Sequence, residues 1–120
     1  MLIPGATGDS EGGHIGAVAA EAYRHGYNIF ICNPVAPRNS DHYKNLECID
    51  YTKTLPIAEA IDHAREIFGD TEMYAMGFSL GSNHLLRYLG ANKNCRPEHR
   101  FKAAISVSGA WDLPATGVEI

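Results

Sequence analysis

The chain has 120 residues, a length that suits one domain able to bury roughly two-thirds of the surface that its unfolded form exposes. Its hydrophobic fraction of 45% and charged fraction of 20% are those of an ordinary soluble globular protein. Because the net charge is −4 and no basic block occurs, nucleic-acid binding has no electrostatic support, and no apolar run approaches the ~20 residues of a membrane span.

The first elements along the chain are predicted to be a strand, a glycine turn, a helix and a second strand. Residues 1–3 are apolar like the end of a buried strand, and residues 4–8 turn away from it. Apolar residues recur at helical spacing over 10–25, and Gly26 ends that helix. A β-branched and aromatic strand follows at 27–32, and the loop after it lies where α/β proteins bind ligands.

The second half repeats this alternation. We expect a helix over 54–68, a strand that ends at Phe78, a helix after Ser79, a polar loop over 92–100 and a last strand over 103–108. The order predicts an α/β fold with a parallel sheet of about four strands and crossover helices. Because the chain opens inside a buried strand and its last strand would be an unprotected edge, we expect residues 1–120 to be a single core fragment, incomplete at both ends.

The segment Gly77–Gly81 reads Gly-Phe-Ser-Leu-Gly, which is the G-x-S-x-G pattern of a nucleophile elbow at the junction of a strand and a helix. A serine there occupies a sharp, strained turn that projects its hydroxyl away from the backbone. Side chains two residues to either side would collide with the adjoining strand and helix. Gly77 and Gly81 are therefore predicted to be structural requirements of the turn.

A serine hydroxyl needs a base to remove its proton and two N–H donors to stabilise the oxyanion. Ser79 is the predicted nucleophile, and the amide of Leu80, at a helix N-terminus, is one predicted donor. The second donor is expected in the turn after the first strand, with Ala6 preferred and Thr7 as the alternative. Gly5 and Gly8 in that turn allow the backbone to approach the substrate carbonyl.

The chain does not supply an obvious base. Each of the six histidines is more readily interpreted as a surface or packing residue: His14, His25, His42, His63, His84 and His99. Asp112 follows the last strand on the active-site edge. It is interpreted either as the acid that orients the catalytic histidine or as a loop or capping aspartate.

Five segments carry a resemblance to a known family: Ile3-Pro4-Gly5-Ala6-Thr7-Gly8, Arg24-His25-Gly26-Tyr27, Ile31-Cys32-Asn33-Pro34, Gly77-Phe78-Ser79-Leu80-Gly81-Ser82-Asn83 and Val107-Ser108-Gly109-Ala110-Trp111-Asp112-Leu113. In this order they resemble one branch of the α/β-hydrolase fold superfamily. That branch contains the ABHD1/ABHD3-type lipid hydrolases, the bacterial YheT-like hydrolases and the plant EMB8-like proteins. The chain departs from its pattern at Ile3, where the family has histidine, and over 35–38, where the family has Arg-Gly-x-Gly.

The resemblance implies a partial α/β-hydrolase fold and a serine carboxylesterase or lipase-like activity through an acyl-enzyme on Ser79. It implies Ala6 and Leu80 as the oxyanion amides and a small-molecule or lipid ester, such as an acylglycerol, as substrate. No metal or organic cofactor is expected. By this resemblance the catalytic acid and histidine lie outside the chain, so these 120 residues alone are expected to lack a complete triad.

Two other readings stay open. A catalytically inactive hydrolase-like fold used for binding would retain Ser79 only as part of the turn. Alternatively, Gly5–Gly8 between a strand and a helix resembles the start of an NAD(P)-binding short-chain dehydrogenase. Glu11 stands where that family has its third glycine, the next strand ends in Asn33 rather than an acid, and no Tyr-x-x-x-Lys occurs. Gly77–Gly81 can also be read as merely a tight connection.

The cellular location is not read from any motif. The three cysteines, Cys32, Cys48 and Cys95, are widely spaced and are interpreted as free thiols in a reducing compartment. The N-terminus lacks the layout of a signal peptide. A cytoplasmic location is the default expectation, with membrane association through a preceding segment as the alternative.

Overall fold

The computed structural model describes residues 1–5, 10, 12–33, 54–91 and 97–112. Its elements alternate between strands and helices along the chain: β1 (Leu2–Ile3), α1 (Gly13–Arg24), α2 (Leu55–Phe68), β2 (Tyr74–Phe78), α3 (Leu80–Ala91), the 3₁₀ turn η2 (Pro97–His99) and β3 (Ala103–Val107). These bounds agree within a few residues with the elements expected from the sequence. The predicted loop over 34–45 lies outside the described residues.

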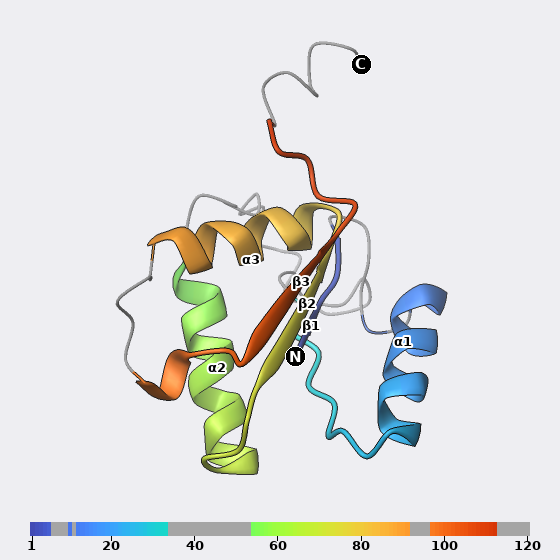
Figure 1. Cartoon of the computed structure of the whole chain (residues 1–120), viewed down its shortest axis with the longest axis vertical. Coiled ribbons are helices and arrows are strands. Elements are labelled where there is room, and N and C mark those ends of the chain that lie inside the picture. Colours follow the sequence, from blue (N-terminus) through green and yellow to red (C-terminus); the bar gives the residue numbers. More distant parts are fainter. Residues whose placement is uncertain (6–9, 11, 34–53, 92–96, 113–120) are drawn as a thin grey trace, which may run out of the picture.

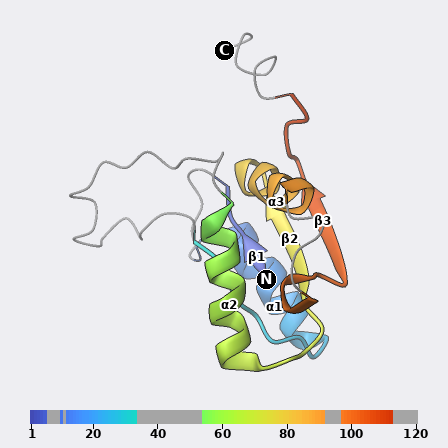
Figure 2. The ribbon, with the colours of Figure 1, turned by 90° about the vertical axis from the view of Figure 1, so that its left-hand side faces the viewer.

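The three strands form one parallel sheet in the order β1-β2-β3. Ile3 is paired with Gly77, and Phe78 is paired with Val107, so the carboxyl ends of all three strands meet at one edge. Helices α2 and α3 lie on one face of the sheet and α1 lies on the other (Figures 1 and 2). The predicted parallel α/β fold is therefore confirmed.

The fourth strand, expected over 27–32, is reduced to a single parallel bridge between Ile31 and Leu2. The Leu2 amide donates to the Phe30 carbonyl at 2.8 Å, and the Cys32 amide donates to the Leu2 carbonyl at 2.9 Å. Because β1 is two residues long, it offers its neighbour only one such pair of hydrogen bonds. The predicted segment lies beside β1, as a parallel fourth strand would, but it does not extend into a ladder.

The core lies between the sheet and the α2–α3 layer. Alternation along β2 points Ala75 toward this layer, where it joins a cluster with residues of both helices. The buried members are Ile3, Cys32, Ile57, Ile61, Ala75, Leu85 and Tyr88. Apolar residues at helical spacing on α2 and α3 thus bury one face of each helix against the sheet.

Glycines end two of the helices in the way that the sequence predicts. Gly26 follows α1 with φ +85°, and Gly69 is the C-cap of α2 with φ +70°. Residues with a Cβ adopt this region at a cost, so glycine there fixes where each helix ends. Pro56 lies in the first turn of α2, where a missing N–H removes no intrahelical bond.

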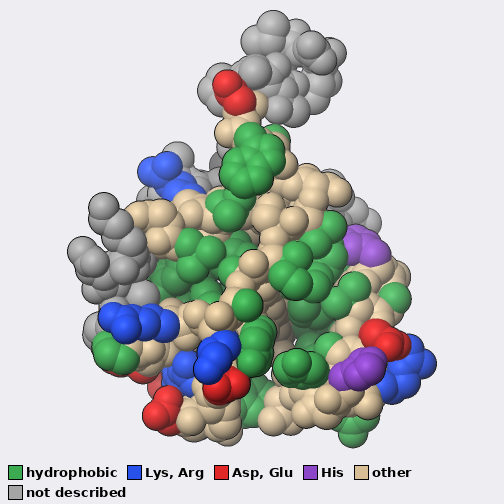
Figure 3. Space-filling model, in the orientation of Figure 1, with side chains coloured by type: hydrophobic (Ala, Val, Ile, Leu, Met, Phe, Trp, Pro, Cys, Tyr) green, Lys and Arg blue, Asp and Glu red, His purple; other side chains and the backbone are tan. Residues whose placement is uncertain are grey.

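The edge of β3 that faces away from β2 is open to solvent. Residues Ala103 to Ser106 are all exposed, and Ile105 is 51% exposed. Figure 3 shows apolar side chains gathered over the middle of this face and charged ones toward its lower rim. Among the described helices, none combines the length and the apolarity needed to span a membrane.

Candidate active site

The candidate site is built on the turn that joins β2 to α3. Ser79 is the single residue between Phe78, the last residue of β2, and Leu80, the first residue of α3. Its φ is +52°, in the left-handed region that residues with a side chain rarely adopt, and its side chain is exposed. The predicted strain at Ser79 is therefore confirmed, and the turn presents the hydroxyl to solvent.

The glycines on either side of Ser79 fill the steric role predicted for them. A Cβ at Gly77 would lie 2.6 Å from the Cα of Ser82 and 2.7 Å from the carbonyl oxygen of Gly81. A Cβ at Gly81 would overlap the backbone carbonyls of Ile3 and Pro4. Because these neighbours are backbone atoms, no side-chain rotation would make room. Strand β2, helix α3 and the end of β1 can approach this closely only with glycine at both positions.

The turn that follows β1 lies directly against Ser79. A Cβ at Gly5 would lie 3.0 Å from the Ser79 Cβ and 3.6 Å from its Oγ. The backbone at Gly5 therefore passes beside the hydroxyl, as expected of a turn that supplies an oxyanion donor. Ala6, Thr7 and Gly8 lie outside the described residues, so the choice of Ala6 as that donor stays a prediction.

Leu80 occupies the other position expected for an oxyanion donor. It is the first residue of α3, so its N–H is one of those for which a helix offers no intrahelical acceptor. The partial positive charge of a helix N-terminus also favours an anion at this point. The geometry is therefore suitable for the Leu80 amide to bind an oxyanion beside Ser79.

Local helix contacts account for two of the histidines, and a ring contact with strand β2 accounts for a third. His25 lies 3.1 Å from Glu21, and His63 lies 3.2 Å from Glu66, each pair on one helix. The ring of His14 packs edge-on against Phe78, with ring centroids 5.6 Å apart. These contacts agree with the interpretation of surface and packing histidines, and His42 lies outside the described residues.

His99 is buried rather than exposed and joins three elements. Its Nδ1 lies 3.1 Å from the Tyr88 hydroxyl of α3, and its Nε2 lies 2.6 Å from Asp62 Oδ1 of α2. His84 is also buried, on the core side of α3. The burial of His99 was not evident from the sequence, because its neighbours Glu98 and Arg100 are charged and exposed.

Asp112 lies on the segment that leaves β3 at the same edge of the sheet as Ser79, and its side chain is exposed. That segment begins with Ser108, whose φ is also +52°. Asn83 of α3 holds the segment through its carboxamide: Nδ2 donates to the Ala110 carbonyl, and Oδ1 accepts from the Ala110 amide at 3.2 Å. In the sequence, Asn83 is the last residue of the segment Gly77–Asn83 that carries the family resemblance, and no role is predicted for it. A further mark is its polar amide within a helix, where asparagine has low propensity.

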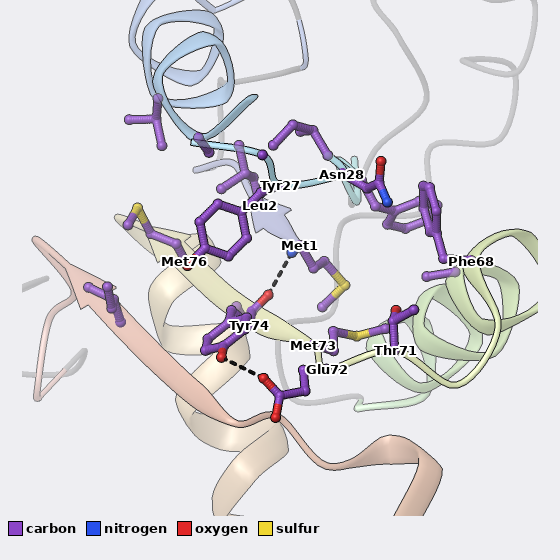
Figure 4. Close-up of a pocket in the computed structure, with 18 residues that line it drawn as sticks. Met1, Leu2, Tyr27, Asn28, Phe68, Thr71, Glu72, Met73, Tyr74 and Met76 are labelled. Carbon is purple, nitrogen blue, oxygen red and sulfur yellow. Dashed lines mark hydrogen bonds between the residues drawn. The ribbon is translucent and has the colours of Figure 1, made fainter. Parts of the chain in front are cut away.

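A hollow of about 660 Å³ lies at the opposite end of the sheet from Ser79. It is mainly apolar and includes Met1, Tyr27, Phe68 and Tyr74 among its lining residues (Figure 4). The Met1 ammonium donates to the Tyr74 carbonyl at 2.6 Å, and burial lowers the pKa of that ammonium. None of the residues Gly77–Gly81 lines this hollow, so it is not part of the elbow.

Within the described ranges, no group of histidine, cysteine and acidic residues is arranged to hold a metal ion.

The α/β hydrolase fold family matches residues 1–118, which include the elbow, the β1 turn and the segment after β3. The chain belongs to the α/β hydrolase fold family.

Two curated relatives are consistent with the EMB8-like branch. The chain is 31% identical to embryogenesis-associated protein EMB8 of Picea glauca over 91 residues, which cover 75% of this chain and 20% of that protein. It is 25% identical to abhydrolase domain-containing protein 2 of Drosophila melanogaster over 97 residues, covering 81% of this chain and 24% of that protein. The chain thus spans about a fifth to a quarter of these relatives. No solved structure shows significant similarity to it.

Proposed function

We propose that this chain provides the nucleophile and oxyanion site of a serine hydrolase that acts on carboxylic esters. The observation that carries the proposal is the exposed Ser79 at φ +52°, placed between a strand and a helix with glycine two residues to either side. Membership of the hydrolase family supports this reading of the turn. The match also covers the N-terminal half on which the dehydrogenase reading depended, and so favours the hydrolase.

In the proposed reaction, the Ser79 Oγ attacks the ester carbonyl carbon while a base takes the hydroxyl proton. The carbonyl oxygen becomes an oxyanion, which the amides of Leu80 and Ala6 stabilise. Collapse of the tetrahedral intermediate expels the alcohol, which receives the proton from the base, and leaves an acyl group on Ser79. Water then attacks this acyl-enzyme by the same steps, releasing the carboxylic acid and restoring the serine hydroxyl.

The base and its orienting acid are proposed to lie outside these 120 residues, with Asp112 as the alternative acid within them. The contacts of His25, His63 and His99 support this assignment, because each pairs with a residue other than Ser79. Lipid or acylglycerol esters are the proposed substrates, on the strength of the resemblance to the branch that contains lipid hydrolases.

Fluorophosphonate labelling tests the proposal, because this probe reacts only with an activated serine. A lysate of the source organism is labelled and digested, and the peptide that carries Ser79 is examined by mass spectrometry, with Ser79→Ala as the control. Modification of Ser79 in a species well above 13.1 kDa is the expected result.

Detection of the peptide only in unmodified form, in a species of 13.1 kDa, would favour the second candidate, an inactive hydrolase-like binding protein. The histidine contacts above are the observation that keeps this candidate open.

A further inference from the structure

The carboxamide of Asn83 makes two hydrogen bonds to the backbone of one residue far away in the sequence. Its Nδ2 donates to the carbonyl of Ala110, and its Oδ1 accepts from the amide of the same residue at 3.2 Å. The side chain therefore pairs with Ala110 as a neighbouring strand would, although it projects from helix α3. Both polar functions of the amide are used, and both contacts are partly buried.

These bonds close a ring of contacts around the backbone of Ser79. The Ser79 amide donates to the carbonyl of Val107, the last residue of β3, at 2.9 Å. The Ser79 carbonyl accepts from the amides of Ser82 at 3.0 Å and Asn83 at 3.3 Å. Asn83 then returns to the segment after β3 through Ala110, so α3 and β3 are joined on both sides of the nucleophile.

A second side-chain bond strengthens the same junction. The hydroxyls of Ser82 and Ser106 are hydrogen-bonded to each other, directly below the turn. A Cβ at Gly109 would lie 2.5 Å from the Ser82 Oγ, so the segment after β3 also packs tightly on the start of α3. These contacts join helix α3 to strand β3 and to the segment over 108–110 at this edge of the sheet. We call this set of contacts the brace.

The brace surrounds two strained residues. Ser79 and Ser108 both have φ +52°, and they are the non-glycine residues with positive φ in the described part of the chain. Because the paired residues Phe78 and Val107 precede them, the two serines end neighbouring strands at the same level. Backbone in this region persists only where surrounding contacts hold it. Asn83 contacts the surroundings of both. Its backbone amide donates to the Ser79 carbonyl, and its side chain bonds to Ala110 in the segment that begins with Ser108.

We propose that Asn83 is a positioning residue for Ser79. By joining the first turn of α3 to Ala110, its carboxamide keeps the nucleophile in the left-handed conformation that presents the hydroxyl to solvent. This inference rests on the proposed function for its catalytic consequence, but its structural content does not depend on that function. Asn83 acts through the backbone, so it is expected to affect the reactivity of Ser79 more than substrate binding.

Hydrogen exchange tests the structural content without any activity. In Asn83→Ala the Ser79 and Ala110 amides should exchange with solvent about tenfold faster or more. The variant lacks the two side-chain hydrogen bonds to Ala110, which oppose local opening of this edge. Amides in α2 should keep their rates. Asn28→Ala is the matched control, since Asn28 is an exposed asparagine far from the elbow. Unchanged exchange at Ser79, or the same acceleration throughout the chain, would overturn the proposal.

Because the base is proposed to lie outside these 120 residues, the catalytic consequence is measured in the full-length source protein, as the rate of fluorophosphonate modification of Ser79 per folded molecule. Asn83→Ala and Asn83→Asp should both slow it about tenfold or more, with KM for an ester substrate within about twofold of wild type. The Asp variant fills the same space but sets a carboxylate against the Ala110 carbonyl, so it separates hydrogen bonding from packing. Wild-type reactivity in the Asp variant would refute the positioning role. If wild-type Ser79 itself fails to react, the proposed function fails, and the exchange experiment still decides whether Asn83 holds Ser79.

Discussion

Replacement of Gly81 by alanine separates the steric argument for the elbow from ordinary helix propensity. Gly81 is the second residue of α3, and alanine is favoured over glycine in a helix by about 1 kcal/mol, so propensity alone predicts a more stable protein. The structure predicts the opposite. The new Cβ would overlap the carbonyl oxygens of Ile3 and Pro4 and would lie 2.8 Å from the Pro4 carbonyl carbon.

The magnitude follows from the kind of atoms involved. The backbone atoms of Ile3 and Pro4 cannot rotate away, so α3 and the end of β1 must separate. The cost should reach about 3 kcal/mol, the upper end of the range for overpacking. Subtracting the propensity gain of about 1 kcal/mol leaves Gly81→Ala destabilised by about 2 kcal/mol. For a chain of this length that corresponds to a melting temperature about 8 °C lower.

Urea and thermal unfolding followed by circular dichroism measure this difference. Gly90→Ala is the matched control: Gly90 lies in the same helix, and a Cβ there meets nothing within 4 Å. The control should be stabilised by about 0.5–1 kcal/mol. If Gly81→Ala unfolds at or above the wild-type midpoint, the claim that this glycine is required by backbone contact is wrong.

Three further changes have definite expected outcomes. Ser79→Gly should stabilise the chain by about 1 kcal/mol in urea unfolding, because glycine adopts the left-handed backbone without the Cβ cost. The same change should abolish fluorophosphonate labelling. A variant no more stable than wild type would contradict the strain assigned to Ser79. His99→Phe should lower the free energy of unfolding in urea by about 1–3 kcal/mol, because it removes the hydrogen bonds to Tyr88 and Asp62. Adding Tyr88→Phe should recover part of this loss. An unchanged free energy of unfolding in His99→Phe would show that these bonds contribute nothing to stability. Burial raises the pKa of the Cys32 thiol above its usual 9.0, so the folded state keeps a proton that the unfolded state loses, and stability should fall as pH rises past that value. Cys32 should accordingly be alkylated by iodoacetamide at pH 8 much more slowly in the folded chain than in urea, and equal rates would disprove its burial.

Local sequence patterns were sufficient to predict most of the fold. The helix over 54–68 follows from apolar spacing, Pro56 in the first turn and Gly69 at the end, and the structure has α2 at Leu55–Phe68. The elbow follows from the G-x-S-x-G pattern around Ser79. The steric requirement at Gly77 is set by Gly81 and Ser82, which are close in sequence, whereas the requirement at Gly81 comes from the distant Ile3 and Pro4 and is predictable only through the pattern. The helix and the contact at Gly77 depend on short-range geometry, which a sequence displays directly.

Features that depend on distant neighbours were not predictable in the same way. The extent of the strand over 27–32 depends on how many residues β1 offers it, and β1 is two residues long. The burial of His99 requires α2, α3 and η2 to converge, and its charged sequence neighbours point the other way. Pairing of Asn83 with Ala110 likewise appears only when β3 is placed beside α3.

The direct succession of β2, α3 and β3 has a consequence for the order in which the chain folds. These elements follow one another from Tyr74 to Val107, and they share the fully paired part of the sheet. Strand β1 instead pairs with β2 across most of the chain, through Ile3 and Gly77, so its loop-closure entropy is larger. The unit from β2 to β3 should therefore form the folding nucleus, with β1 docking afterwards against Gly81. Substitutions in the brace at Asn83 would then slow folding, whereas substitutions in β1 would chiefly speed unfolding.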